Sequence, residues 1–327
     1  MQGRDEDWMT YQAIRAAWLS FVGGRTQGEI AAEMGISSAK VHRLIAHAQK
    51  SGFVKFQIEG RPLECLQLES FFCEEFGLKR CTIAPDLGGA DQSTAIRAVA
   101  SAAGQVLSSL LAAPEVRRVG VGMGRTLKAA FEAVSRQTRD DLEIVSICGS
   151  LTRSLSANPY DVVQLLQARV GGEGYYLPVP YFAANEEEKR VFLSQKSVQE
   201  VMRRARQADV FIIGIGSVEK EGHLIQRGMI SRDEESDLAR SGAVCDLMGR
   251  FLTIDGEEAS APLGDCAVGL HFDEVKGARV IALVGGESKA TAVLAALRTG
   301  VITDLIADET LARALKKMVG SKLARTA

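Results

Sequence analysis

Histidines, paired cysteines and an excess of either charge are all scarce in this sequence, and each scarcity argues against a class of protein. The 327 residues include four histidines and six cysteines, and no two cysteines have the C-x-x-C spacing of a zinc ribbon. The 39 basic and 41 acidic residues leave a net charge of −2, so the chain is not a polycation that coats nucleic acid or acidic membranes. We therefore expect no metal and no cofactor, and any nucleic-acid contact must come from a local basic patch.

Long apolar segments are lacking as well. Residues 1–7 are polar and acidic, unlike the apolar part of a secretory signal, and no stretch reaches the roughly 20 apolar residues that span a bilayer. We expect a cytoplasmic protein with no membrane partner. Its scattered cysteines are then expected to stay reduced and to act as small buried hydrophobic side chains.

The pattern of apolar and polar residues differs between two parts of the chain. Residues 1–60 read as helices, whereas residues 61–327 alternate amphipathic helical segments with apolar runs that end in small residues. We therefore expect two domains with these bounds, the second an α/β domain on a largely parallel sheet. The predicted strands are Arg118–Gly122, Glu143–Cys148, Val210–Gly214, Arg279–Val284 and Asp304–Ala307, with a further buried strand in the run Tyr175–Pro180. The predicted helices are Leu127–Gln137, Pro159–Val170, Val198–Arg206, Lys289–Arg298 and Glu309–Lys317.

The junction between the two domains, Arg61–Gly77, predicts one more helix. Pro62 suits the first turn of a helix, where a missing N–H costs nothing. The apolar face of this helix would consist of Leu63, Leu66, Phe71 and Phe72. The helix is then either a plain connector or a contact between subunits.

The segment Thr26–Gly52 predicts two helices joined by a tight turn. Thr26 and Glu29 have the spacing of a capping box, Gly35 suits the left-handed conformation that ends a helix, and Ser37 can cap the next helix. This is the pattern of a helix-turn-helix domain. A preceding helix, Trp8–Val22, would complete the core through Ile14, Trp18 and Leu19, and Phe53–Ile58 alternates like the strand of a wing.

The outward face of the second helix decides between DNA binding and an ordinary solvated bundle. Residues 38–55 contain four lysines or arginines and two histidines but no acidic residue, and phosphate contacts supply much of the affinity for DNA. His42 and His47 lack the further ligands that a metal would need. We predict that double-stranded operator DNA is bound by Gln27, Ser37, Ser38, Lys40, His42, Arg43 and His47.

Three segments, 120–126, 214–217 and 285–289, place glycines at the ends of predicted strands. In a parallel sheet the carboxyl ends of the strands meet at one edge, where glycine lets backbone N–H groups approach a ligand. Neither the dinucleotide pattern nor the P-loop pattern is complete in these segments. They predict a pocket for a small ligand, either a phosphorylated compound or a neutral polyol.

Charged and polar side chains near these segments are candidates for that pocket. Arg125 and Lys289 offer positive charge, although Lys289 can instead pair with Glu287. Asp246 and Arg250 either reach the pocket or form a structural ion pair, and Asn158 either binds the ligand or caps a helix. The predicted effector-binding residues are Gly122, Gly124, Arg125, Thr126, Gly149, Ser150, Asn158, Gly216, Ser217, Asp246, Arg250, Glu287 and Lys289.

With these motifs the sequence resembles the SorC family of bacterial sugar-responsive transcription regulators, from about Ala16 to Met318. The resemblance is carried by residues 26–31, 34–37, 41–45, 120–126, 214–217, 242–251, 284–289 and 304–309. It implies a winged helix-turn-helix head and a Rossmann-like α/β effector domain that resembles sugar-phosphate isomerases. It also implies a homotetramer or homodimer controlled by a sugar, polyol or sugar phosphate. Arg125, His42 and Ala307 depart from the family pattern, so the shape of the pocket and the operator sequence do not carry over.

We therefore predict a transcriptional regulator of a carbohydrate or polyol catabolic operon, and not an enzyme. One alternative is a sugar-phosphate isomerase-like enzyme with a helical extension, in which Asp161, Glu287 and Lys289 act as acid–base groups. Another is a DNA-binding protein whose α/β domain only forms oligomers. The basic helix argues against the first alternative and the three glycine-rich strand ends argue against the second.

Overall fold

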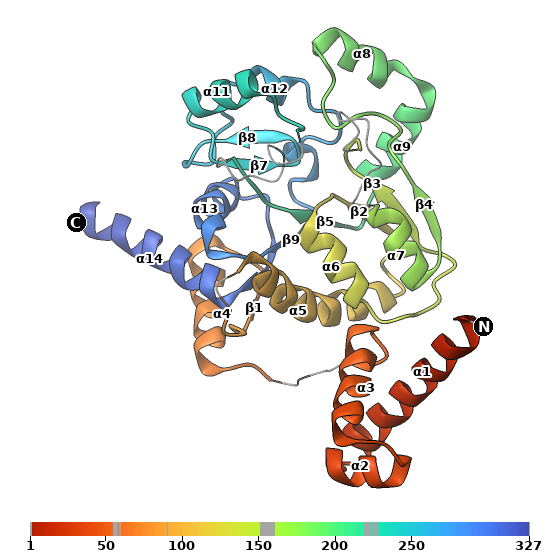
Figure 1. Ribbon diagram of the computed structural model, residues 1–327. Helices are drawn as coiled ribbons and strands as arrows, with labels where there is room; N and C mark the ends of the chain where they lie inside the picture. Colours follow the sequence, from red (N-terminus) through yellow and green to blue (C-terminus); the bar gives the residue numbers. More distant parts are fainter. Residues whose placement is uncertain are drawn as a thin grey trace. The chain divides into compact units, whose positions relative to one another are not determined.

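The structure, a computed structural model, describes residues 2–54, 58, 60–89, 91–150, 161–218, 224 and 228–326. The chain divides into two compact units, Met1–Gly60 and Arg61–Ala327. Each unit has its own cluster of buried apolar side chains. The first unit is called the head below, and the second is called the α/β domain (Figure 1).

The head consists of three helices, α1 (Gln2–Ala17), α2 (Gln27–Met34) and α3 (Ser38–Lys50), and α1 continues into a π-helical turn, η1 (Trp18–Val22). The prediction that Trp18 lies in the core is wrong, because its side chain is 63% exposed. Small side chains face inward from α1 instead, which turns Trp18 outward and leaves Ile14 and Leu19 half-buried. The core residues are Ala13, Ala16, Ala17, Ile30, Ala31, Val41, Leu44, Ile45 and Ala48.

Capping interactions set the two helices of the predicted helix-turn-helix. The Thr26 hydroxyl accepts from the backbone N–H of Glu29 at 3.3 Å, and the Glu29 carboxylate accepts from the backbone N–H of Thr26 at 2.8 Å. Gly35 ends α2 at φ 65°, and the Ser37 hydroxyl accepts from the N–H of Lys40 at 3.3 Å. The helix-turn-helix prediction is confirmed. Residues 55–57 of the predicted wing strand lie outside the described residues.

Seven parallel strands form the sheet of the α/β domain, in the order β1-β10-β9-β5-β2-β3-β4. The first five strands predicted from the sequence are all found, as β2, β3, β5, β9 and β10. The predicted α/β fold class is confirmed. The strand expected at 175–180 is wrong, because the observed strand ends at Tyr175. The strands are β1 (Arg80–Ala84), β2 (Arg118–Val121), β3 (Glu143–Ser146), β4 (Glu173–Tyr175), β5 (Val210–Gly214), β9 (Arg279–Val284) and β10 (Asp304–Asp308).

Helices cover both faces of this sheet (Figure 1). Right-handed crossovers place a helix on opposite faces when the strand order runs in opposite directions. One face carries α5 (Gln92–Ala112), α6 (Arg125–Ala133) and α7 (Val162–Val170), and the other carries α9 (Lys196–Arg206), α13 (Ala290–Arg298) and α14 (Glu309–Thr326). By length and composition α5 is apolar enough to cross a membrane, but it packs on the sheet and against α6, as a core helix does.

Helix α4 (Leu63–Phe76) is the predicted junction helix, and it packs against β1 and α14. Its predicted apolar face is partly wrong, because Leu63 is 65% and Leu66 is 41% exposed. The buried face is rotated and includes Cys65, Leu68, Glu69 and Phe72. Glu69 takes part because its carboxylate receives hydrogen bonds from both β1 and Arg61.

A smaller antiparallel sheet lies beyond β5 and consists of β6 (Gly216–Ser217), β7 (Cys245–Leu247) and β8 (Arg250–Leu252). Met248 and Gly249 form the two-residue turn between β7 and β8, at φ 56° and 84°. Positive φ at both positions is what a type I′ hairpin turn requires. The remaining short elements are α8 (Glu186–Ser194), α11 (Arg232–Arg240), α12 (Pro262–Asp265), η2 (Phe272–Val275) and η3 (Glu287–Lys289).

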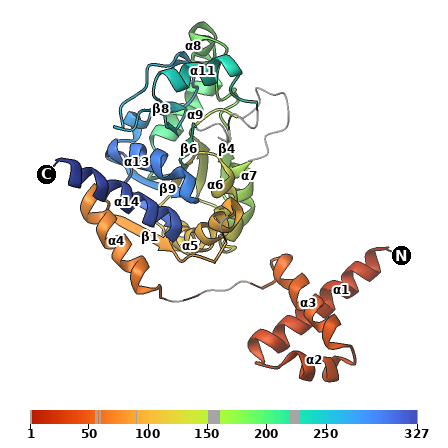
Figure 2. The same ribbon diagram turned by 60° about the vertical axis from the view of Figure 1, so that its left-hand side comes forward.

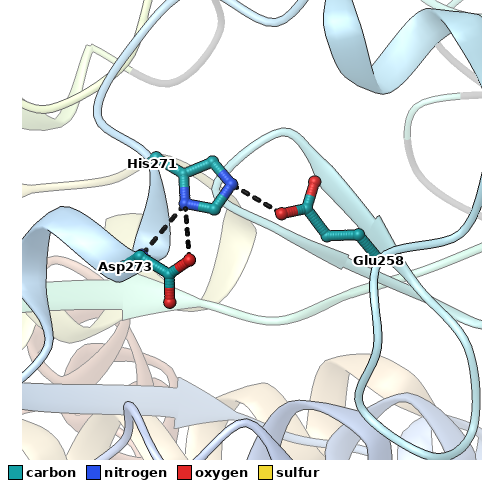
Figure 3. Close-up of side chains that lie close together, drawn as sticks. All are labelled: Glu258, His271 and Asp273. Atoms are coloured by element: carbon teal, nitrogen blue, oxygen red, sulfur yellow. Dashed lines mark hydrogen bonds and ion pairs between the residues drawn. The ribbon is translucent and has the colours of Figure 1, made fainter.

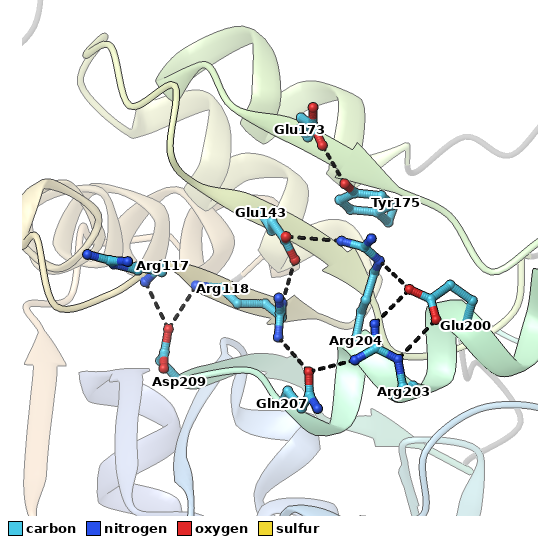
Figure 4. A network of polar contacts seen from close by, with 10 residues as sticks. All are labelled: Arg117, Arg118, Glu143, Glu173, Tyr175, Glu200, Arg203, Arg204, Gln207 and Asp209. Carbon is cyan, nitrogen blue, oxygen red and sulfur yellow. Dashed lines mark hydrogen bonds and ion pairs between the residues drawn. The ribbon is translucent and has the colours of Figure 1, made fainter.

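Ion pairs close the amino edge of the large sheet (Figure 4). Arg118 of β2 and Arg204 of α9 bind the carboxylate of Glu143 at 2.5 and 3.0 Å. The Asp209 carboxylate accepts from the backbone N–H groups of Arg117 and Arg118, both at 2.8 Å. These contacts tie β2, β3 and β5 together at one end, so the opposite, carboxyl edge is left for a ligand.

Candidate functional site

A pocket lies at the carboxyl ends of β2, β5 and β9, where the glycine-rich segments predicted it. Its volume is about 100 Å³. One water molecule needs about 10–15 Å³ of such space, so the pocket holds a ligand of several non-hydrogen atoms. The lining residues are Gln92, Ile96, Gly122, Met123, Gly124, Arg125, Thr126, Leu127, Ile147, Cys148, Tyr181, Ile213, Gly214, Ile215, Gly216, Leu224, Asp246, Met248, Leu283 and Lys289.

The first turn of α6 forms one wall of the pocket. Gly124 precedes the helix at φ 134°, a conformation that L side chains rarely adopt. Thr126 is buried, and among the described residues its hydroxyl has no hydrogen-bond partner. Arg125 is exposed at the same turn. This wall therefore offers backbone N–H groups, a hydroxyl and a guanidinium, a set of donors suited to an anion or to several hydroxyls.

Lys289 supplies a second positive charge on the glycine-rich segment that follows β9. Its ammonium donates to the carbonyl oxygen of Ile215 at 2.8 Å, which links the ends of β9 and β5 across the pocket. Burial, helped by the positive charge of Arg125, lowers the pKa of Lys289 to about 8. The negative charge of a bound ligand would offset both effects and favour the protonated ammonium.

Asp246 of β7 also lines the pocket, and the residue is 8% exposed. Its Oδ1 accepts from the N–H of Gly249 at 2.9 Å and from the hydroxyl of Tyr181 at 3.3 Å. Its Oδ2 has no partner among the described residues and is free to accept from a ligand hydroxyl. Burial raises the pKa of this carboxyl to about 6, although Gly249, Tyr181 and Lys289 each act to lower it.

Seven of the predicted effector-binding residues line the pocket, namely Gly122, Gly124, Arg125, Thr126, Gly216, Asp246 and Lys289. Gly149, Ser150, Ser217, Arg250 and Glu287 do not, and Asn158 lies outside the described residues. The guanidinium of Arg250 donates to the carbonyl oxygen of Gly264 at 2.9 Å and lies 3.8 Å from the Asp265 carboxylate, so its role is structural but it does not pair with Asp246. Of the three groups considered for acid–base catalysis, Lys289 alone lines the pocket.

Two of the excluded residues act behind the pocket wall. The Gly149 N–H donates to Val268, and a Cβ at this glycine would lie 2.2 Å from the carbonyl oxygen of Pro180. Ser150 exchanges backbone hydrogen bonds with residues 179 and 181, which holds Tyr181 beside the pocket. Asp161 caps α7 by accepting from the N–H of Gln164 at 3.1 Å.

Several pocket residues are missing from the sequence prediction. Gln92, Cys148, Tyr181 and Met248 come from segments far apart in the chain, and nothing in their local sequence indicates that they meet. Of these four residues, Met248 could have been suspected from the sequence, because it precedes Gly249 in a tight hairpin turn. Its positive φ is uncommon for a side chain of its size, and such strain is often found at ligand sites.

The predicted nucleic-acid interface lies on one face of the head. His42 and Arg43 are exposed on α3, and Lys40 and His47 are half-buried beside them. Ser37 and Ser38 stand at the start of this helix, and Gln27 is the exposed first residue of α2. The apolar residues of α3 point away from this face into the head core, so the basic side chains remain available to phosphates and base edges.

A second polar cluster lies away from the pocket and consists of Glu258, His271 and Asp273 (Figure 3). His271 Nε2 lies 2.6 Å from the Glu258 carboxylate, and His271 Nδ1 accepts from the backbone N–H of Asp273 at 3.1 Å. Both ring nitrogens therefore have protein partners. The cluster ties residue 258 to the start of η2, and we interpret it as a structural brace.

Comparison with known proteins agrees with this fold. A family model described as "Putative sugar-binding domain" matches residues 60–316. The erythritol catabolism regulatory protein EryD of Brucella abortus (strain 2308) is 36% identical over 303 residues, which are 93% of this chain and 95% of the relative. Many solved structures are similar to this chain, and two of them serve as examples. The full-length sorbitol operon regulator SorC of Klebsiella pneumoniae has a TM-score of 0.72 at 23% identity, over 93% of this chain and 97% of that one.

The second solved structure is a domain of a possible sugar-binding transcriptional regulator from Arthrobacter aurescens TC1. It has a TM-score of 0.71 at 25% identity, over 78% of this chain and 99% of that chain. A helix-turn-helix head joined to a sugar-binding α/β domain defines a transcriptional regulator and not an enzyme. The chain belongs to the SorC family of sugar-binding transcriptional regulators.

Proposed function

We propose that this regulator acts in the cytoplasm on a polyol or sugar catabolic operon, and that its effector binds in the pocket at the carboxyl edge of the large sheet. The observation that carries the proposal is that one pocket is lined by the ammonium of Lys289, the carboxylate of Asp246 and the hydroxyl of Thr126, which has no hydrogen-bond partner among the described residues. Such a mixture of donors and acceptors suits a small molecule with several hydroxyl groups. The name of the relative EryD supports a short polyol or its phosphate.

In this proposal the head reads operator DNA with α3. Basic side chains on the exposed face bind phosphates, and the residues near the start of the helix, Ser38 and Lys40, reach base edges. Effector binding changes the affinity for the operator only if the two states of the protein bind the effector differently. The coupling between pocket and head is therefore the quantity to measure.

We also propose that the protein is a homo-oligomer whose heads pair through α1. Exposed apolar side chains recur along α1 and its continuation η1 at spacings of three, seven and four residues, namely Trp8 (59% exposed), Tyr11 (55%), Trp18 (63%) and Val22 (69%). Such spacing is typical of a helix that packs along a second helix. A second copy of the same row is the partner that fits, because two related half-sites on DNA require two heads.

Thermal unfolding against a panel of compounds tests the effector site. The panel is erythritol, sorbitol and the monophosphates of both, and a ligand at about 100 times its dissociation constant adds about 2.7 kcal/mol of stability. We expect at least one compound to raise the unfolding temperature. Lys289→Met is expected to abolish this shift, and the matched control Lys276→Met, which removes an exposed lysine, is expected to keep it.

The pattern of shifts distinguishes the two ligand classes. A shift with the phosphates alone assigns the positive wall of Arg125 and Lys289 to a phosphate group. A shift with the free polyols assigns the pocket to a neutral effector held by hydroxyl contacts. A full shift that survives in Lys289→Met would contradict the pocket assignment.

A further inference from the structure

The glycine-rich segment that carries Lys289 is held in place by two side chains from other elements. The Gln92 amide donates to the carbonyl oxygen of Gly285, and the Asp308 carboxylate accepts from the N–H of Gly286 at 2.6 Å. Gly286 has φ 102°, and a Cβ there would lie 2.3 Å from the Gln92 side-chain oxygen. The position of Lys289 in the pocket therefore depends on contacts that Gln92 and Asp308 make with the preceding glycines.

Asp308 uses its other carboxylate oxygen on a different element. Its Oδ2 accepts from the N–H of Leu311 at 3.1 Å and from the hydroxyl of Thr310, both in the first turn of α14. The side chain is 2% exposed. One buried carboxylate thus joins the pocket segment to the start of α14. A displacement of Gly286 must either shift α14 or leave a buried charged oxygen without its partner, which is costly.

Helix α14 in turn packs against α4, and the two helices meet in both views (Figures 1 and 2). The Glu309 carboxylate accepts from the N–H of Asp86 at 3.0 Å, just beyond β1. The ammonium of Lys316 lies 4.9 Å from the centre of the Phe71 ring on α4. A shift of α14 would therefore disturb its contacts both with the residues just after β1 and with α4.

Hydrogen bonds and an ion pair also connect the first residue of the α/β domain, Arg61, to α4 and β1. Glu69 of α4 is 8% exposed, and its carboxylate accepts from the N–H of Ile83 in β1 at 2.8 Å. The same carboxylate binds the guanidinium of Arg61 through two contacts, at 2.9 and 3.0 Å. Arg61 is the first residue of the domain after the head. Strand β1 is also the sheet neighbour of β10, with Ala84 opposite Asp308.

We propose that Asp308 is the positioning residue that couples occupancy of the pocket to the junction with the head, and that the Glu69–Arg61 pair is the far end of this connection. The inference rests on the proposed function, because it takes the pocket as the effector site. Neither Asp308 nor Glu69 lines the pocket. Their substitution therefore changes the response to effector while leaving effector affinity largely in place.

Asp308→Asn tests this coupling. The asparagine oxygen still accepts from the Gly286 N–H, but the NH2 group that replaces Oδ2 cannot accept from the N–H of Leu311. The measurement is the ratio of operator dissociation constants with and without the panel compound that stabilises the wild type, with effector affinity measured by calorimetry. Allosteric ratios are typically about 5- to 150-fold. We expect the ratio to fall to below about 2-fold, with effector affinity changed less than about 3-fold. An unchanged ratio would overturn the proposal.

Two further variants keep the test decisive if Asp308→Asn folds poorly. Glu69→Gln retains the acceptor for Ile83 but weakens the bond to Arg61, and it lies far along the chain from the glycine segment. We expect the same loss of coupling. The control is Asp209→Asn at the opposite edge of the sheet, where the aspartate also accepts from two backbone N–H groups. Its ratio should equal that of the wild type, and equal loss in this control would overturn the assignment to Asp308.

A measurement without effector separates this inference from the proposed function. Hydrogen exchange of the Gly286, Leu311 and Ile83 amides reports the three hydrogen bonds directly. In Asp308→Asn we expect faster exchange at Gly286 and Leu311 and also at Ile83, which Asp308 does not touch. Faster exchange confined to Leu311 would show a plain helix cap and overturn the coupling. If no panel compound changes operator binding of the wild type, the proposed effector class fails, and this exchange result still decides the role of Asp308.

Discussion

At Asp246, burial and hydrogen bonding act on one carboxyl group in opposite directions, and burial is the larger effect. The pKa of about 6 lies above the ordinary value for aspartate, so the folded protein binds this proton more tightly than the unfolded chain does. Stability contributed by this group is therefore greatest at low pH and falls as the pH rises through about 4 to 6. The facing groups Tyr181, Cys148 and Cys245 all have raised pKa values and stay neutral in this range.

Asp246→Asn removes this dependence on pH. Asparagine can still accept from Gly249 and Tyr181 but carries no charge. We expect the free energy of unfolding of the variant, relative to wild type, to improve by on the order of 1 kcal/mol between pH 5 and pH 7. Urea unfolding of both proteins at the two pH values measures this difference. A difference that is the same at both pH values would show that Asp246 does not titrate there.

At the scale of single elements, α3 has one face that packs in the core of the head and an opposite face with the predicted DNA contacts. Val41, Leu44, Ile45 and Ala48 are buried, and the basic side chains lie on the other side. The arrangement lets a side chain on the exposed face be removed without disturbing the core. Effects of such a change on DNA binding can therefore be read as contact effects.

Arg43→Ala should weaken operator binding and reduce its dependence on salt. If Arg43 binds a phosphate, the slope of log affinity against log salt falls by about 1, whereas a contact to a base changes sequence preference and leaves most of the slope. Fluorescence anisotropy with operator DNA at several salt concentrations distinguishes the two. Arg240→Ala, which removes an exposed arginine of the α/β domain, is the control and should change neither quantity.

The elements also show what the sequence can and cannot predict. Strands such as β5 and β9 were predictable because each is an apolar run ended by glycine, and the capping box at Thr26 fixed the start of α2. Strand β1 was not predicted because Arg80 and Thr82 interrupt its apolar residues, and β6 to β8 were not predicted because strands of two or three residues give little periodic signal. The pocket was predicted at its glycines and at Lys289, whereas Tyr181 and Met248 enter it through long-range contacts that no local pattern encodes.

At the scale of the whole molecule, the row of exposed apolar side chains along α1 and η1 predicts how copies associate. Trp18→Glu places a charge in the centre of this row without entering the head core. We expect the mass measured by analytical ultracentrifugation to fall by one step of association, and operator affinity to fall by at least tenfold because paired heads bind DNA together. Val191→Glu, which charges an exposed apolar residue of α8, should keep the wild-type mass. An unchanged mass in Trp18→Glu would contradict pairing through α1.

The pairing of β1 with β10 has a consequence for how the protein is made. Strand β1 is the first strand of the α/β domain and lies at the edge of the sheet, and its sheet partner is β10 (Asp304–Asp308). The ribosome must therefore synthesise residues 85–308 before this edge can close, whereas the head has short-range contacts and precedes β1 in the chain. A chain still under synthesis thus acquires its DNA-reading part before its sensor is complete, and β10 completes the sheet of the sensor.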